Sequence, residues 1–213
     1  MSLLTIKKAK QKMKFYIAAD NMMNRGYFRP KIKTKLIGII YPDYIMRYLK
    51  ALRKAEYYIN IGKCHSLGFL LNKYRLSSLG MRLGFSINPN VLGYGVVIPH
   101  YGTIVVGNGN KIGNYAVLHT STCITAGSKV IGDALYLSTG AKIINDITLG
   151  DRISVAANAV VNKSFVESGR LLVGIPAVDK MPRSAWYEED GEKYMQKVEK
   201  IEKYAKKMGF QQE

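Results

Sequence analysis

The stretch Val106–Val166, VGNGNKIGNYAVLHTSTCITAGSKVIGDALYLSTGAKIINDITLGDRISVAANAVVNKSFV, carries an aliphatic residue at every sixth position, with one added residue in the 126–129 loop. No helix fits this spacing, because six is not a multiple of roughly 3.6 and the side chains would scatter around the axis. Hexapeptide repeats are typical of parallel β-helices, in which three repeats form one triangular coil with an aliphatic side chain from each repeat inside. The positions concerned are Val106, Ile112, Leu118, Ile124, Ile131, Leu137, Ile143, Leu149, Val155 and Val161.

The rest of the chain divides around these repeats into two helical parts. We expect a basic α-helical region over 1–85, the β-helix over 86–168, and an exit arm with a C-terminal helix over 169–213. Apolar spacing predicts helices near 1–20, 42–60, 67–82 and 194–208, a loop over 25–35, and an extended arm at 171–177. Because the β-helix is the central domain, the expected fold class is mainly β.

The net charge of +17 is concentrated in the first region, where residues 1–85 contain 18 Lys and Arg against three Asp and Glu. Such a field favours an acidic partner, and the helix near 42–60 has a basic face made of Arg47, Lys50, Arg53 and Lys54. This face is either simply solvated or a contact for an anionic membrane surface or an acidic acceptor. No nucleic-acid-binding motif accompanies it, so nucleic acid is not an expected partner.

The composition contains neither a secretory signal nor an apolar run of the roughly 20 residues that span a bilayer. The two cysteines, Cys64 and Cys123, lack metal-ligand spacing and cannot form a disulfide framework. We therefore expect a reduced, cytoplasmic protein that can lie at the inner face of the membrane.

Two of the three histidines, His100 and His119, lie in or beside the repeats, 19 residues apart. This spacing is close to one coil of three hexapeptides, so stacking should place both on the same side of the prism, one layer apart. Histidine is the side chain best suited to accept a proton near neutral pH. The segment 98–106 also interrupts the regular repeat, as a functional turn would.

The run Pro99-His100-Tyr101-Gly102-Thr103-Ile104-Val105-Val106-Gly107-Asn108 resembles the histidine-bearing turn of serine acetyltransferases and of their capsule and exopolysaccharide acetyltransferase relatives. The match continues through Ile112-Gly113, Val117-Leu118-His119, Val130-Ile131-Gly132-Asp133, Gly140-Ala141-Lys142-Ile143 and Gly174-Ile175-Pro176-Ala177. It covers residues 84–180 and is specific for hexapeptide acyltransferases. It implies a left-handed β-helix, a homotrimer with active sites between subunits, and acetyl-CoA as the acyl donor without a metal.

The resemblance also implies roles for individual residues. His100 matches the general base that takes the proton of the acceptor hydroxyl, and His119 matches a second histidine of the polysaccharide-modifying relatives. Tyr101 is expected to contact the acceptor. Thr139 and Ala157 are expected to contact CoA through their backbone groups. Lys163 and Lys180 are expected to bind the phosphates of CoA.

Two departures from the serine acetyltransferase pattern bear on the acceptor. Phe85 stands where those enzymes carry an acidic residue, and their Arg/His-bearing loop shrinks here to 125–129, with Lys129 as the remaining cation. A serine carboxylate would lose its clamp, so we predict acetyl transfer to a sugar hydroxyl of a capsular or exopolysaccharide precursor. Serine O-acetylation is the alternative enzyme activity, and a catalytically inert trimeric scaffold is the alternative from another class.

Overall fold

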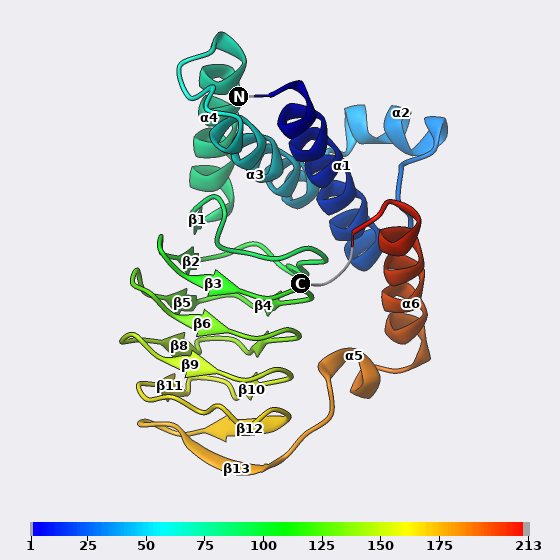
Figure 1. The fold of residues 1–213 in the computed structure, drawn as a ribbon. Coiled ribbons are helices and arrows are strands. Elements are labelled where there is room, and N and C mark those ends of the chain that lie inside the picture. The colour runs from blue at the N-terminus through cyan, green and yellow to red at the C-terminus, as the bar shows by residue number, and fades with distance from the viewer. Residues whose placement is uncertain (1, 211–213) are drawn as a thin grey trace.

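The computed structural model describes residues 2–210, and its centre is a stack of about five three-sided coils (Figure 1). Two-residue to five-residue strands make its three faces, which we call face 1, face 2 and face 3. Face 1 holds β1 (Phe85–Ile87), β2 (Ile104–Val106), β5 (Thr122–Ile124), β8 (Lys142–Ile143) and β11 (Val160–Val161). Face 2 holds β3 (Lys111–Ile112), β6 (Val130–Ile131) and β9 (Thr148–Leu149). Face 3 holds β4 (Val117–Leu118), β7 (Tyr136–Leu137), β10 (Ser154–Val155), β12 (Arg170–Val173) and β13 (Val178–Pro182).

The six-residue repeat fills the interior as predicted. All ten aliphatic positions of the repeat are 5% exposed or less, and they form one core with the helices near the first coil. Consecutive coils pair in parallel, as in Val117↔Tyr136 and Ile104↔Thr122. The added residue near 126–129 appears as a 19-residue offset between Lys111 and Val130. The predicted β-helix is confirmed.

The C-terminal end of the stack differs from the sequence expectation. The first coil begins at Phe85, within one residue of the expected start, where β1 pairs with β2. At the other end, Leu171–Val173 does not leave the coils as an arm, because β12 still pairs in parallel with β10. The chain then reverses, and β13 pairs antiparallel with β12. The apolar residues at 171–173 therefore serve as one more strand of face 3, which a six-residue repeat ending at Val161 did not reveal.

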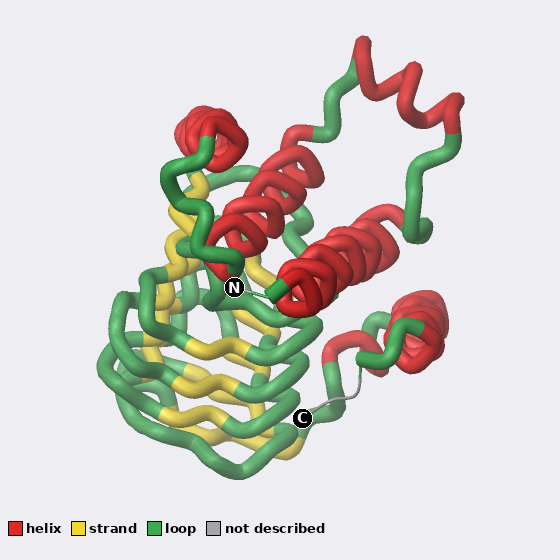
Figure 2. The backbone as a smooth tube through the Cα atoms, turned by 45° about the horizontal axis from the view of Figure 1, so that its top comes forward, coloured by secondary structure: helices red, strands yellow, loops and turns green. Residues whose placement is uncertain are grey.

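Four helices precede the coils: α1 (Leu3–Arg25), α2 (Ile32–Ile40), α3 (Tyr44–Asn60) and α4 (Leu67–Leu83). Three of them agree with the predicted ranges, whereas α2 occupies part of the expected loop over 25–35. After the coils, α5 (Trp186–Glu189) and α6 (Glu192–Lys207) return along the stack toward α1 (Figures 1 and 2). Ile201 and Ala205 of α6 are buried against Phe15 and its neighbours, so the predicted C-terminal helix docks within its own chain.

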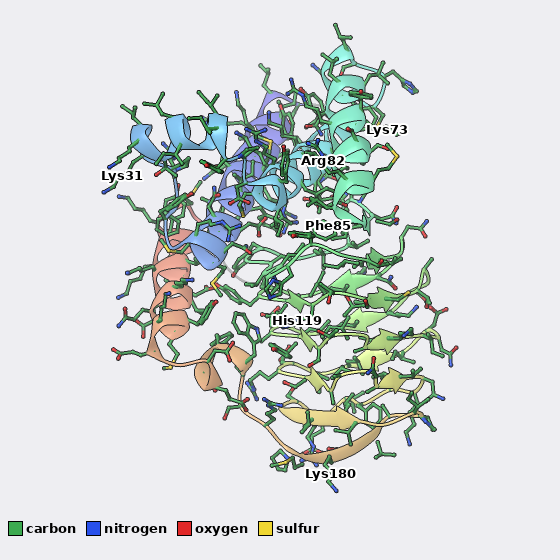
Figure 3. The ribbon with its side chains drawn as sticks, turned by 180° about the vertical axis from the view of Figure 1, so that it is seen from behind. Lys31, Lys73, Arg82, Phe85, His119 and Lys180 are labelled. Carbon is green, nitrogen blue, oxygen red and sulfur yellow. The ribbon has the colours of Figure 1, made fainter. Side chains whose placement is uncertain are left out.

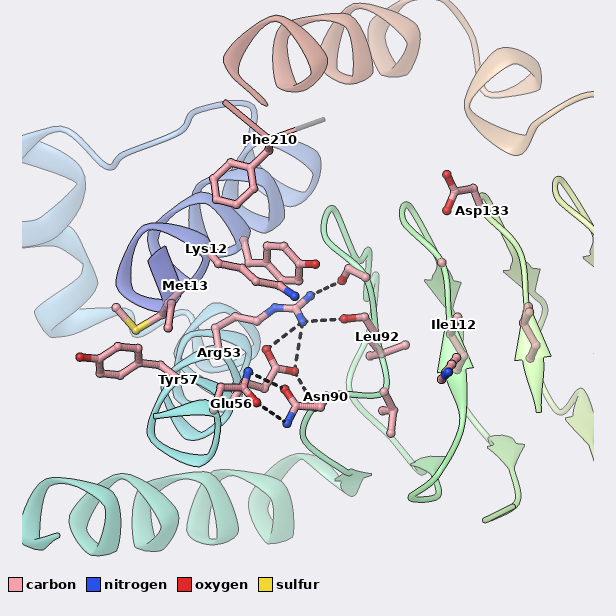
Figure 4. Close-up of a pocket in the computed structure, with 18 of the residues that line it drawn as sticks. Lys12, Met13, Arg53, Glu56, Tyr57, Asn90, Leu92, Ile112, Asp133 and Phe210 are labelled. Atoms are coloured by element: carbon pink, nitrogen blue, oxygen red, sulfur yellow. Dashed lines mark hydrogen bonds and ion pairs between the residues drawn. The ribbon is translucent and has the colours of Figure 1, made fainter. Parts of the chain in front are cut away.

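The buried guanidinium of Arg53 joins the helices to the first coil (Figure 4). It forms ion pairs with Asp20 of α1 and Glu56 of α3, at 2.8 and 3.2 Å. It also donates to the carbonyl oxygens of Leu92 and Gly93. Arg53 is therefore unavailable to the basic face that the helical spacing predicted, and that part of the prediction is wrong.

Candidate functional site

The candidate site lies at the corner where face 3 passes into face 1, which we call the histidine corner. It consists of residues 99–103, 119–121, 138–141 and 156–159 in successive coils. The register confirms that His100 and His119 lie at the same corner in adjacent coils, since Val97↔Val117 and Ile104↔Thr122 flank them on either side. The two histidines are close enough for the charge of one to affect the pKa of the other.

The turn that carries His100 is larger than the turn below it. Six residues, 98–103, separate the paired positions Val97 and Ile104, whereas four, 118–121, separate Val117 and Thr122. The two additional residues let the chain project from the corner, and His100 and Tyr101 are both exposed, Tyr101 by 75%. Within residues 2–210 no hydrogen bond holds the His100 ring, so its nitrogens remain open to an incoming hydroxyl.

The end of α4 fixes this turn in place. Gly84 ends the helix in the left-handed region, with φ 79°, and the backbone N–H of Gly102 donates to Leu83 O at 2.9 Å. Ile104 N–H donates to Gly84 O at 3.0 Å. Gly102 itself has φ 138°, and a Cβ there would lie 3.1 Å from Cγ2 of Thr120. The helical region thus has a direct part in placing His100.

His119 is half-buried and has a defined partner. Its Nε2 lies 2.9 Å from Oη of Tyr136, with the two rings 5.1 Å apart between centroids. Burial lowers the pKa of His119, the charge of His100 lowers it further, and Asp190 opposes both effects. Figure 3 places His119 on the side of the coils near α5. A neutral His119 beside His100 favours proton acceptance at this corner near neutral pH.

Tyr136 is the site residue that the sequence analysis missed. It is the strand residue paired with Val117, one coil on, so its ring reaches diagonally to His119. The 19-residue offset introduced by the 126–129 loop would have placed it on face 3 beside this corner. Its partnership with a histidine depends on side-chain direction, which the repeat does not specify.

Small residues continue the histidine corner below the two histidines. Thr139 and Ala157 are both exposed there, and Asn158 N–H donates to Thr139 O at 2.9 Å. Each of the lower turns contains a residue with positive φ, as Gly140 does at 75° and Asn158 at 59°. Side chains of this size leave the backbone edge of the corner accessible to an extended ligand arm.

The two predicted phosphate-binding lysines lie elsewhere on the stack. Lys163 is exposed beyond β11, at the corner between faces 1 and 2, with its Nζ 5.5 Å from the centroid of the Phe165 ring. Lys180 is exposed on β13, at the far end of the coils (Figure 3). Within one chain, the structure therefore brings His100, Tyr101, His119, Thr139 and Ala157 to one corner and leaves the two lysines outside it.

Two further sequence expectations change once the side chains are seen. Lys129 is fully buried, and its Nζ donates to Thr125 O at 2.9 Å and Ala126 O at 3.2 Å. Since it stabilises its own loop, it is no remnant of a carboxylate clamp. Phe85 is buried edge-to-face against Tyr48, with ring centroids 5.2 Å apart, so its position belongs to the core.

Two cavities lie away from the histidine corner. One of about 1040 Å³ lies between α1, α3 and face 2, and the residues in Figure 4 line it. Another, of about 760 Å³, lies among α1, α2 and α3. Neither is lined by His100 or His119. Among residues 2–210, no cluster of His, Cys, Asp and Glu has the geometry to hold a metal ion, and both cysteines are free thiols.

The repeat, the three parallel faces and the corner turns define a left-handed β-helix of hexapeptide repeats. Solved serine acetyltransferases share this fold: the soybean enzyme has a TM-score of 0.62 and 22% identity over 79% of this chain and 70% of its own. The Neisseria gonorrhoeae enzyme has a TM-score of 0.59 and 19% identity over 84% and 71%. At these identities the structural match establishes the fold alone.

Sequence similarity also leads to serine acetyltransferases. The serine acetyltransferase of Buchnera aphidicola from Acyrthosiphon pisum is 30% identical over 61% of this chain, which spans 48% of that relative. The Helicobacter pylori 26695 enzyme is 27% identical over 54% of this chain and 75% of its own length. This chain thus spans about half the length of the Buchnera relative. No protein-family model matches the sequence.

These relatives overturn the predicted polysaccharide acceptor. All seven curated proteins that match are serine acetyltransferases, and the resemblance to the capsule and exopolysaccharide branch is not confirmed. The prediction of a sugar rested on absent groups, at Phe85 and in the shortened loop. The absence of a contact weakens the case for one acceptor but gives no evidence for another acceptor. The inference of a sugar was wrong for this reason.

Proposed function

We propose that this chain is an acetyl-CoA-dependent serine O-acetyltransferase with His100 as its general base. The observation that carries the proposal is the position of His100, exposed on an enlarged turn above a second histidine. The chain is also 30% identical to a serine acetyltransferase over 61% of its length. One of the solved structures of this fold is a serine acetyltransferase with CoA bound, and another has serine bound. Both ligands are here assigned to the histidine corner by that similarity.

The chemistry requires one base and no covalent enzyme intermediate. His100 accepts the proton of the serine hydroxyl as its oxygen attacks the thioester carbonyl, forming a C–O bond. The C–S bond then breaks, and the proton on His100 passes to the CoA sulfur. His119 keeps the corner free of a second positive charge at neutral pH, because its own pKa is lowered. Its ring is held by a hydrogen bond with Tyr136.

The small residues below the histidines are assigned to the donor. Thr139 and Ala157 leave the backbone edge open to the pantetheine arm, and Tyr101 extends beside the acceptor. Lys163 and Lys180 lie at other positions on the same chain, so they reach the CoA phosphates of a site only if neighbouring subunits bring their faces together. We accordingly propose a homotrimer with each site between two subunits.

Release of CoA thiol from acetyl-CoA tests this function, with serine and a panel of other hydroxyl compounds as acceptors. Serine should stimulate release, and His100→Ala should lower kcat/KM for serine by about 10²–10⁴-fold, the usual contribution of a general base. His65→Ala, another exposed histidine in the helical region, is the matched control and should retain activity.

Two results would contradict the proposal. Equal turnover by wild type and His100→Ala would remove His100 from the mechanism. Stimulation by another hydroxyl compound in the absence of any response to serine would assign the corner to a different acceptor.

A further inference from the structure

Helix α2 exposes more than half of each of its large apolar side chains. None of its nine residues is buried, and it projects from the helical end of the molecule, away from the coils (Figures 1 and 2). Ile32, Ile39 and Ile40 are each about three-quarters exposed, and Leu36 is 60% exposed. A short helix with its large aliphatic side chains in water is expected to have a partner.

Four of the five large apolar residues share one face of α2. At 100° per residue, Ile32, Leu36, Ile39 and Ile40 fall within about a third of the helical circumference, whereas Ile37 lies outside this face. Lys33 and Lys35 border this face on opposite sides. Thr34, Ile37 and Gly38 line the cavity shared with α1 and α3, and Lys35 lies at its rim. Arg47 Nη2 donates to Gly38 O there at 2.8 Å. The apolar face therefore points outward, with a lysine along each edge.

The charge around this face is of one sign. The four cations closest in sequence are Arg29, Lys31, Lys33 and Lys35, and no Asp or Glu occurs between Asp20 and Asp43. Both of those carboxylates already have arginine partners, Asp20 with Arg53 and Asp43 with Arg25. Cations bordering an exposed aliphatic stripe are the arrangement that helices use at an anionic lipid surface, where lysine stems extend toward the headgroups.

We propose that α2 docks this protein on an anionic lipid bilayer, parallel to its surface. Within residues 2–210 no helix is both long and apolar enough to cross a bilayer. A second copy of the chain is the poorer partner, because it would bring the same cations against Lys33 and Lys35. A face of four side chains is also small beside the roughly 800 Å² that each partner of a standard interface buries. The inference stands independently of the acetyltransferase proposal.

Vesicle flotation tests the docking surface with the full chain. Wild type should bind vesicles of phosphatidylcholine with about 30% phosphatidylglycerol and not vesicles of phosphatidylcholine alone, with affinity falling as salt rises. Lys33→Gln with Lys35→Gln should weaken binding about thirtyfold. The matched control, Lys203→Gln with Lys207→Gln on α6, removes the same charge from another exposed helix and should have little effect.

The aliphatic face is tested separately by Ile39→Asp with Ile40→Asp, which should abolish vesicle binding. Its control is Leu70→Asp with Leu71→Asp, two leucines of α4 that are 53% and 54% exposed. Unchanged circular dichroism establishes that the variants fold. Vesicle binding that survives both α2 variants overturns the proposal. Loss of a larger oligomer in light scattering, without lipid binding by wild type, would instead identify α2 as a contact between copies.

Discussion

At the scale of single residues, the site depends on two histidines with different surroundings. His100 is exposed on its turn, whereas His119 is half-buried and hydrogen-bonded to Tyr136. Burial disfavours the charged form of His119, and a positive charge on His100 disfavours it further. Proton binding by His119 is thus disfavoured, which keeps a second positive charge away from the exposed ring of His100.

The unequal pair gives a prediction for NMR titration of the imidazole nitrogens. The pKa of His119 should lie below the ordinary value of 6.5, and His100→Ala should raise it part of the way back, since burial persists. Because the unfolded chain binds this proton more readily, His119 should make stability fall as pH drops below 6.5. His119→Gln should lessen that fall. A pKa unchanged by His100→Ala would show that the rings are not coupled.

At the scale of elements, the end of α4 and the His100 turn are locked together. Gly84 ends the helix with φ 79°, and a Cβ there would lie 3.0 Å from the carbonyl carbon and oxygen of Gly102. Gly26 ends α1 with a similar φ of 80° but has no atom within 4 Å of its Cβ position. Substitutions at the two glycines therefore distinguish the effect of backbone strain, which both share, from the effect of contact with the turn, which only Gly84 has.

Gly84→Ala should lower both stability and acetyl transfer, whereas Gly26→Ala should lower stability alone. Each substitution costs about 1 kcal/mol for the left-handed conformation. Gly84→Ala additionally displaces the turn by pressing on Gly102, and a small displacement of a catalytic group can reduce the rate about a hundredfold. Urea unfolding and thiol-release assays on both variants measure the two effects. Equal activity of both variants would mean that α4 does not position His100.

At the scale of the whole molecule, Arg53 connects α1, α3 and the first coil through buried polar contacts. Arg53→Met would leave Asp20 and Glu56 without their cation in the interior. Removing one partner of a buried ion pair costs about 3–5 kcal/mol. Lys50→Met, on the exposed side of the same helix, should change the free energy of unfolding by less than about 0.5 kcal/mol. Thermal unfolding of both variants makes the comparison; similar melting temperatures would contradict it.

The six-residue repeat made the coils predictable, because each repeat is a local unit and its stacking follows from chain spacing. The shared corner of His100 and His119 followed in the same way. The burial of Arg53 and Lys129 did not, because neither helical spacing nor the six-residue repeat specifies which cations find internal partners. Helix α2 was not predicted, because its nine residues contain too few turns for apolar spacing to distinguish a helix from a loop.

The direction of β13 has a consequence beyond its own strand. A stack of parallel coils ends in unpaired N–H and C=O groups that would template another identical stack, end to end. Helices α3 and α4 cover the first coil, and β13 closes face 3 at the other end by running against β12. A second stack placed end-on would meet an antiparallel strand on face 3, so that face cannot continue the parallel pairing by which the coils stack.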